Sequence, residues 1–373
     1  MDFGSVRLWD DGTTWADLQP APSRWNWEPL DRAVAAAERA GLRPMLVLGQ
    51  TPAWASSDPR APGVHVPGTG EPPRSLALWS AYVTAVADRY YGRIRAYEVW
   101  NEPNYVSDYF HGSEADMARL TESAYAAVKA VDPDALVVSP GLATRTPGQR
   151  GWLYRYLDEL DPAAVDVIAL HLYPPTGEGP ETAAVQLDTV ITALRARGID
   201  KPVWNTEVNY GVVEPEAVAP PIPDDVAAGF LARTLIVNRA SGVSRVYWYA
   251  WWHNRSLGIN LTDDAGPTRA MRAWRATRAW LEGGRLAGCR TRDDEWSCVL
   301  HRDDGSLRLI VWTTATPVGL PAPAGAAALT GLDGRETPLD PGATVRLTGT
   351  PTLITGPGLT AAAAAAFLER PTR

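Results

Sequence analysis

A repeated order of short apolar run, loop and amphipathic helix is the feature that most constrains the fold of this chain. The order continues from the N-terminus to about residue 282 and is typical of parallel βα units. We predict seven strands, at Ser5–Leu8, Pro44–Leu48, Ala96–Trp100, Leu136–Ser139, Val165–Leu170, Pro202–Asn205 and Arg245–Tyr249. Helices are predicted at Leu30–Ala40, Leu76–Tyr90, Ala115–Val131, Gly151–Leu160, Thr182–Arg197, Asp225–Ala240 and Thr268–Leu281.

Seven such units fit either an open doubly wound sheet or a barrel. Two observations favour the barrel: no glycine-rich phosphate turn follows the first strand, and polar and aromatic residues cluster just after nearly every strand. We therefore expect an α/β fold, a (β/α)8 TIM barrel, over residues 1–283. Because eight strands close such a barrel, one strand is missing or replaced, and we expect it to be the first, before Met1.

The residues after 283 follow a different pattern. Short alternating segments separated by Gly, Pro and Asp predict a small antiparallel β domain over residues 284–357. Residues 358–373 include an alanine run, which predicts a terminal helical tail with little apolar surface to bury. The only cysteines, Cys289 and Cys298, flank a polar turn, so a cross-strand disulfide and two free buried thiols both remain open.

Charge and composition limit the partners of the chain. With 35 basic and 43 acidic residues the net charge is −8, so we expect neither nucleic acid nor a membrane as a partner. The start MDFGSVRLWD lacks the basic then apolar order of a signal peptide. We expect a secreted or extracellular protein whose signal is not in this chain, with a cytoplasmic protein as the alternative. The sequence does not indicate an oligomeric state.

Two glutamates stand just after predicted strands. Glu102 lies in YEVWNEPN (97–104), before a proline that ends regular structure, and Glu207 lies in KPVWNTEVNYG (201–211). In a parallel barrel the carboxyl ends of all strands open onto one face. We therefore expect both carboxyl groups to converge there, although three βα steps separate them.

A protonated and an ionised carboxyl group facing each other are the minimum equipment for cleaving a glycosidic bond. When the two groups are about 5 to 5.5 Å apart, the ionised one attacks the sugar and the reaction retains its anomeric configuration. Sixteen Trp and thirteen Tyr also favour a sugar-binding cleft, because such rings cover apolar sugar faces and keep a polar group available. The pattern predicts a retaining O-glycoside hydrolase acting on an oligo- or polysaccharide, without a cofactor.

The WNEP motif at Glu102 and the TE motif at Glu207 resemble those of the clan A glycoside hydrolases. Within that clan the chain is most similar to the family 39 xylosidase and iduronidase group, over roughly residues 5 to 282, and the trailing β domain is also similar. The resemblance implies that Glu102 is the acid/base and Glu207 the nucleophile of a double displacement on β-linked saccharides. A β-xyloside is the best single expectation for the substrate.

The same resemblance suggests two residues that assist the glutamates. Arg7 is similar to the arginine that supports the charge of the nucleophile, a role suited to a fixed guanidinium donor. A structural ion pair between Arg7 and Glu98 is the alternative. Asn101 looks like the residue that bonds the sugar 2-hydroxyl, a contact that strengthens in the transition state.

Five further residues are candidates for substrate binding. His171 and Tyr173 are two apart and should point the same way, toward the nucleophile, although His171 could instead satisfy a backbone carbonyl. Trp248 or Trp251 resembles the eighth-strand tryptophan beneath the cleaved sugar, and we favour Trp248. Trp54 either stacks on a sugar or caps the core.

Two other functions fit parts of the pattern. A carbohydrate-binding barrel without hydrolysis would explain a missing strand, but it would not need both glutamates. A metal-dependent hydrolase would use histidines and carboxylates at strand ends. Only five histidines are present and none forms an HxH or HExxH pair, so we expect no metal site.

Overall fold

The computed structural model describes residues 3–105, 109–212, 218–220 and 222–369. The chain divides into two compact units. The first comprises Met1–Tyr173, Gln186–Val208 and Ser244–Tyr247, and the second comprises Pro174–Val185, Asn209–Val243 and Trp248–Arg373. The predicted domain limits at residues 283 and 357 stay predictions.

The first unit is built on parallel strands. One sheet has the order β1 (Ser5–Leu8), β2 (Arg43–Leu48), β3 (Ala96–Val99), β4 (Leu136–Val138). The other has the order β5 (Leu142–Ala143), β6 (Ile168–His171), β7 (Val203–Val208), β8 (Val243–Trp248). Isolated parallel bridges from Asn101 to Gly141 and from Val138 to Val167 connect the two. The seven predicted strands are confirmed; the expected strand before Met1 lies outside the described residues.

The strands contribute to a common core. Because alternate residues of a strand point to the same face of its sheet, successive strands add side chains to one buried cluster. Its fully or nearly fully buried members are Met45, Ala96, Val138, Val167, Ala169, Trp204 and Tyr247. Tyr247 of β8 also shares a side-chain hydrogen bond with Ser5 of β1. The strands of the two sheets therefore share one buried core.

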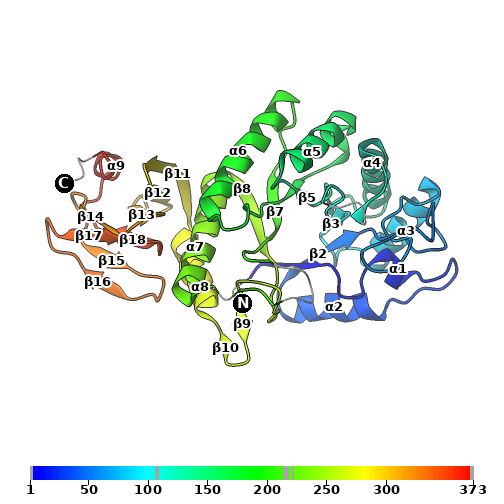
Figure 1. Cartoon of the computed structure of the whole chain (residues 1–373), viewed down its shortest axis with the longest axis horizontal. Coiled ribbons are helices and arrows are strands. Elements are labelled where there is room, and N and C mark those ends of the chain that lie inside the picture. Colours follow the sequence, from blue (N-terminus) through cyan, green and yellow to red (C-terminus); the bar gives the residue numbers. More distant parts are fainter. Residues whose placement is uncertain (1–2, 106–108, 213–217, 221, 370–373) are drawn as a thin grey trace. The chain divides into compact units, whose positions relative to one another are not determined.

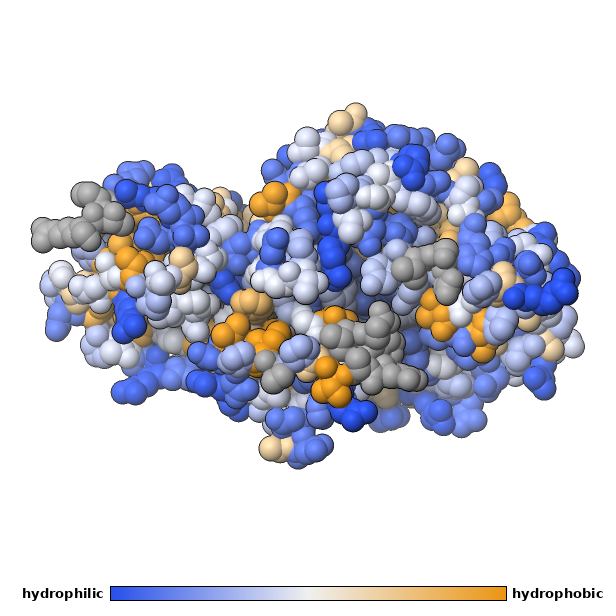
Figure 2. Space-filling view, in the orientation of Figure 1, coloured by the Kyte–Doolittle hydropathy of each residue, from blue (hydrophilic) through white to orange (hydrophobic). Residues whose placement is uncertain are grey.

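Helices cover the outside of these strands, as Figure 1 shows for α2 to α5 around β2, β3 and β5. They confirm the predicted helices within a few residues, and only the four-residue α1 was not predicted. Their bounds are α1 (Trp15–Leu18), α2 (Glu28–Arg39), α3 (Leu76–Arg89), α4 (Glu114–Val131), α5 (Pro147–Glu159) and α6 (Pro180–Ala196). Hydrophilic residues prevail over α5 and α6 in Figure 2. Among the described residues, no helix combines the length and apolarity needed to cross a bilayer.

The second unit joins two helices to an antiparallel sheet. Helices α7 (Asp224–Ala240) and α8 (Arg269–Leu281) pack on each other and on β11, and a short β9 (Thr262–Asp263) pairs with β10 (Gly266–Pro267). The sheet order is β11 (Gly284–Arg292), β12 (Glu295–Arg302), β13 (Leu307–Thr313), β18 (Thr352–Thr355), β15 (Ala328–Thr330), β16 (Glu336–Pro338). A separate pair is β14 (Val318–Pro321) with β17 (Thr344–Leu347). The antiparallel β region was predicted, but β14 and β16 were not among the strands expected there. All residues of β16 are exposed and show no alternation.

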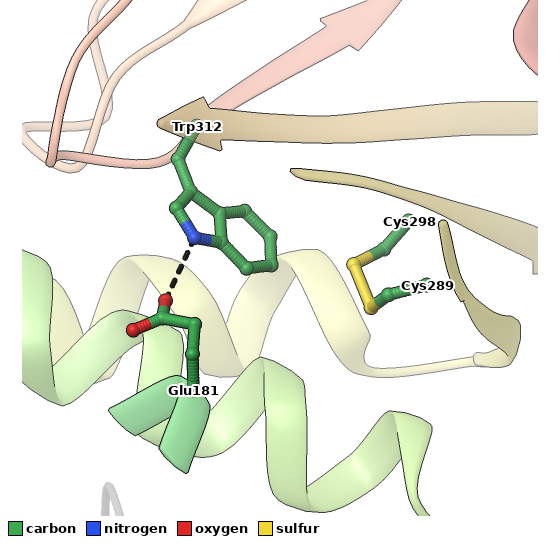
Figure 3. The surroundings of a disulfide bond; sticks show 4 residues. All are labelled: Glu181, Cys289, Cys298 and Trp312. Atoms are coloured by element: carbon green, nitrogen blue, oxygen red, sulfur yellow. Dashed lines mark hydrogen bonds between the residues drawn. A yellow bond between two sulfur atoms is a disulfide. The ribbon is translucent and has the colours of Figure 1, made fainter. Parts of the chain in front are cut away.

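The cysteines form a disulfide, which settles the alternative left open by the sequence. A bulge between Leu286 and Cys289 brings Cys289 opposite Cys298 on the neighbouring strand. Figure 3 shows the pair and the indole of Trp312, which donates from Nε1 to Oε1 of Glu181 at 2.8 Å. Disulfides persist in oxidising compartments, so the bond favours the predicted location outside the cytoplasm, which stays a prediction.

The terminal tail differs from our expectation. Its helix, α9, covers only Ala361–Ala365, but Phe367 and Leu368 are 0% and 6% exposed in the core of the β sheet. The expectation that the tail has little to bury is therefore wrong. The two apolar residues behind the alanine run give the short helix a hydrophobic anchor.

Candidate active site

Arg7 forms hydrogen bonds with two acidic residues of the first unit, Glu98 and Glu207, and with Asn101. Its Nη1 donates to Oε2 of Glu207 at 2.7 Å, and its Nη2 donates to Oδ1 of Asn101 at 2.7 Å. Nη2 and Nε also donate to Oε1 of Glu98, at 2.6 and 3.1 Å. Both alternatives for Arg7 are therefore observed together, since one guanidinium bridges Glu98 and Glu207.

Glu207 lies on β7 and is 8% exposed. Besides the Arg7 contact, its Oε1 accepts a hydrogen bond from the hydroxyl of Tyr173 at 2.8 Å. Each of its two oxygens therefore has a hydrogen-bond donor that fixes its position.

Glu102 follows β3 and has a different environment. It is 8% exposed, and the described residues give its side chain one hydrogen bond, between Oε1 and Nδ1 of His171 at 2.9 Å. Burial raises the pKa of Glu102 to about 7, although the positive charges of Arg7 and Arg145 oppose the rise. Near neutral pH about half of these carboxyl groups therefore hold a proton that they can donate.

His171 is neutral in this site. Burial, with a smaller contribution from Arg7, lowers the pKa of His171 to about 4. Its Nε2 lies 3.5 Å from Nη2 of Arg7, and its Nδ1 lies 2.9 Å from Oε1 of Glu102. The neutral ring therefore contacts both Arg7 and Glu102.

Gly141 fixes the backbone that presents Glu102. Trp100 and Glu102 both have positive φ, 76° and 44°. The amide of Glu102 donates to the carbonyl of Gly141 at 2.9 Å, and the amide of Gly141 donates to the carbonyl of Trp100 at 3.1 Å. A Cβ on Gly141 would lie 2.4 Å from Nε2 of His171 and 2.9 Å from Oε1 of Glu98. A glycine is therefore needed where these side chains meet the backbone.

We expect Gly141→Ala to lower the free energy of unfolding by about 1 to 3 kcal/mol, because overpacking forces buried groups to move. Urea unfolding monitored by circular dichroism measures this loss. Gly148→Ala is the matched control, since the nearest atom to a Cβ there is 3.9 Å away. Equal stability of the two variants would contradict the close approach at Gly141.

The predicted tryptophans have the following neighbours among the described residues. Trp54 donates its indole N–H to the carbonyl of Gln19 at 2.7 Å and packs edge-on to Trp15, so it contributes to the packing of the first unit. Trp248 and Trp251 belong to the second unit. There, Trp248 lies beside Tyr210, with ring centroids 6.1 Å apart, and Trp251 is 52% exposed. Their stacking on a sugar stays a prediction.

Two residues near the glutamates were not found from the sequence. Arg145 lies over the ring of Tyr173 at 5.4 Å and acts electrostatically on Glu102. Gly141 accepts a hydrogen bond from the backbone amide of Glu102. Both follow a strand, as the predicted site residues do. We missed them because Pro140, which has no N–H to donate, interrupts the ladder between β4 and β5 and makes the strand seem to end early.

The cluster also offers donor atoms for a metal. One atom each from Glu102, His171 and Glu207 lies within 4.8 Å of the others, and all three residues are buried. The Arg7 guanidinium, 2.7 Å from Glu207, would repel a cation placed there. The same distances place two carboxyl groups where both could act on one bond.

Comparisons with known proteins indicate the family of this chain. Residues 6–252 match the model of the glycosyl hydrolases family 39. A β-xylosidase from Geobacillus stearothermophilus is 29% identical over 159 residues, which is 40% of this chain. The matched segment spans 31% of that relative's length.

Solved structures share the fold over nearly the whole chain. A family 39 glycoside hydrolase from Bacteroides cellulosilyticus WH2 matches with a TM-score of 0.71 and 21% identity, over 94% of this chain and 74% of that one. A family 39 enzyme from Xanthomonas axonopodis pv. citri matches at 0.64 and 17%, over 95% and 87%. A monomeric β-xylosidase from Caulobacter crescentus CB15 matches at 0.60 and 16%, over 92% and 87%.

Proposed function

The chain belongs to family 39 of the glycosyl hydrolases, and we propose that it hydrolyses β-linked saccharides with retention, using Glu207 as nucleophile and Glu102 as acid/base. The observation that carries this proposal is the approach of the two carboxyl groups, with oxygens within 4.8 Å. Retaining enzymes hold these groups about 5 to 5.5 Å apart, and inverting enzymes about 6.5 to 9.5 Å. We also infer that β8 closes on β1 as in a (β/α)8 barrel, which the Tyr247–Ser5 hydrogen bond supports.

In the first step Glu207 attacks the anomeric carbon while Glu102 protonates the departing oxygen. Tyr173 and Arg7 hold the two oxygens of Glu207, so the carboxylate is oriented before the substrate arrives. The hydrogen bond between Nδ1 of the neutral His171 and Oε1 of Glu102 orients that carboxyl group. The products are a glycosyl ester on Glu207 and the free leaving alcohol.

In the second step Glu102 is ionised and acts as a base. It removes a proton from water, the water oxygen attacks the anomeric carbon, and Glu207 departs as a carboxylate. The near-neutral pKa of Glu102 suits both directions of proton transfer, because the group can exist in either form at the working pH. Arg7 then stabilises the carboxylate that is released.

We infer a β-xyloside as the substrate because relatives in sequence and in structure carry the name β-xylosidase. The test is a panel of aryl β-glycosides, with xyloside beside glucoside, galactoside and glucuronide, in the presence and absence of a chelator. We expect hydrolysis that favours the xyloside and is insensitive to the chelator. Sugar binding without any product, or activity lost on chelation, would reject the proposed chemistry.

The pH dependence follows from Glu102. Because this residue must start protonated, kcat/KM should fall as the pH rises through about 7, the pKa of Glu102. Arg145 favours the ionised form, so Arg145→Gln should move this basic limb to higher pH, by about 0.5 unit. Arg119→Gln, at an exposed ion pair with Asp116, is the control and should not move it. A limb that moves to lower pH in Arg145→Gln would contradict the assignment.

A further inference from the structure

Glu98 is a buried carboxylate that the proposed reaction does not use. It is 0% exposed on β3, and its partners on the neighbouring strands are Val47 and Val138. A charge in such an apolar layer is costly unless it is paired and hydrogen-bonded. Its pairing with Arg7, at 2.6 Å, offsets this cost.

The contact with Glu98 fixes the orientation of Arg7. A guanidinium is a planar, rigid fork, so holding one edge determines where the remaining N–H groups point. Oε1 of Glu98 holds the edge formed by Nε and Nη2 of Arg7. Nη1 is thereby directed to Oε2 of Glu207. The position of Arg7 beside Glu207 thus depends on Glu98.

Because of the contact with Glu98, the positive charge of Arg7 is shared between two ion pairs. One guanidinium lies between two carboxylates, Glu98 and Glu207. With both ionised, the three groups carry a net charge of −1. If Glu98 were neutral, the full positive charge would be balanced by Glu207 alone, which would make Glu207 a weaker nucleophile. The uncompensated positive charge of Arg7 would also favour loss of the proton from Glu102.

We propose that Glu98 is a positioning residue: its carboxylate orients Arg7 and offsets its charge, so that Glu207 stays nucleophilic and Glu102 stays protonated. This inference rests on the proposed function. A second observation supports it, because Oε2 of Glu98 is buried and has no hydrogen-bond partner among the described residues. A pair kept only for stability would be expected to satisfy both oxygens, or to be replaced by apolar residues.

The titratable groups around Glu102 come from five elements. Arg7 on β1 and Arg145 after β5 act on it electrostatically. His171 on β6 shares a hydrogen bond with it, and an oxygen of Glu207 on β7 lies within 4.8 Å. Glu98 on β3 acts through its pair with Arg7. Arg7 and Arg145 favour loss of the Glu102 proton, and a carboxylate paired with Arg7 offsets part of that effect. Removing the charge of Glu98 should therefore lower the pH at which Glu102 ionises.

The test compares Glu98→Gln with Glu98→Asp in the full chain, using the pH profile of kcat and kcat/KM on the best aryl β-glycoside. Glu98→Gln keeps the size and an acceptor but removes the charge, so we expect kcat to fall about 10- to 100-fold and the basic limb to move down by about 0.5 to 1 pH unit. Glu98→Asp keeps the charge but shortens the reach, so kcat should fall while the limb stays in place.

Glu181→Gln is the matched control, because Glu181 forms a similarly buried pair with Arg233, at 3.1 Å. It should reduce stability without moving the limb. A folded Glu98→Gln with wild-type kcat and limb would overturn the proposal. If Glu98→Gln does not fold, the Glu98→Asp variant decides. A wild-type kcat in that variant would overturn the proposal, and a reduced kcat with the basic limb of the pH profile unmoved would support it. Failure of the proposed function would instead appear as unchanged turnover in Glu207→Ala.

Discussion

Replacing Glu207 with alanine is expected to lower kcat/KM for an aryl β-xyloside by about 1,000-fold or more, because the variant has no group to form the covalent intermediate. Sodium azide should restore part of the turnover by occupying the space of the lost carboxylate. The azide then attacks from the side where Glu207 stood, so the product should be the α-glycosyl azide. Steady-state kinetics and NMR of the azide adduct measure both effects.

The control for this variant is Glu181→Ala, which removes another buried, arginine-bound glutamate. It should retain turnover once its folding is verified. A Glu207→Ala protein that is folded and hydrolyses the substrate at the wild-type rate would exclude Glu207 as the nucleophile. So would rescue by azide that gives the β-glycosyl azide, because that product requires an intermediate on another residue.

Replacing Glu102 with alanine is expected to have an effect that depends on the leaving group. General acid catalysis contributes about 10²- to 10⁴-fold, and a poor leaving group such as an alkoxide needs it most. An activated dinitrophenolate leaves without a proton, so its first step should be nearly unchanged and the glycosyl-enzyme should accumulate. Burst kinetics and a comparison of aryl and alkyl glycosides measure this difference.

Azide should also rescue Glu102→Ala, but with the opposite stereochemistry. It attacks the intermediate on Glu207 from the face where Glu102 stood, which gives the β-glycosyl azide. An equal loss of rate for all leaving groups, with no burst, would show that Glu102 is not the proton donor. The two variants therefore separate the roles of the two glutamates by product as well as by rate.

Much of the parallel-strand unit could be predicted from the sequence. Buried strands such as β2 and amphipathic helices such as α4 have strong periodic patterns, and glycine or proline marks their ends. Once the strands were known, one rule placed the glutamates: polar residues at the carboxyl ends of parallel strands share a face. That rule requires no side-chain detail, which is why it indicated Glu102 and Glu207 together.

The finer contacts could not be predicted because they depend on packing between distant segments. The sequence put His171 on the nucleophile's side, where it lies close to both glutamates, but it could not show that Nδ1 bonds Glu102. The role of Gly141 depends on the space left by His171 and Glu98, which no local pattern reports. The disulfide required the bulge before Cys289, and the tail required knowledge of where Phe367 packs.

The central claim is that two acidic side chains act on one bond by successive displacements. Proton NMR of the sugar released from the best aryl β-glycoside, recorded before mutarotation, tests it most directly. We expect the β anomer to appear first and the α anomer to grow in later. The α anomer as the first product would contradict the account, because a single displacement by water would then have replaced the glycosyl-enzyme on Glu207.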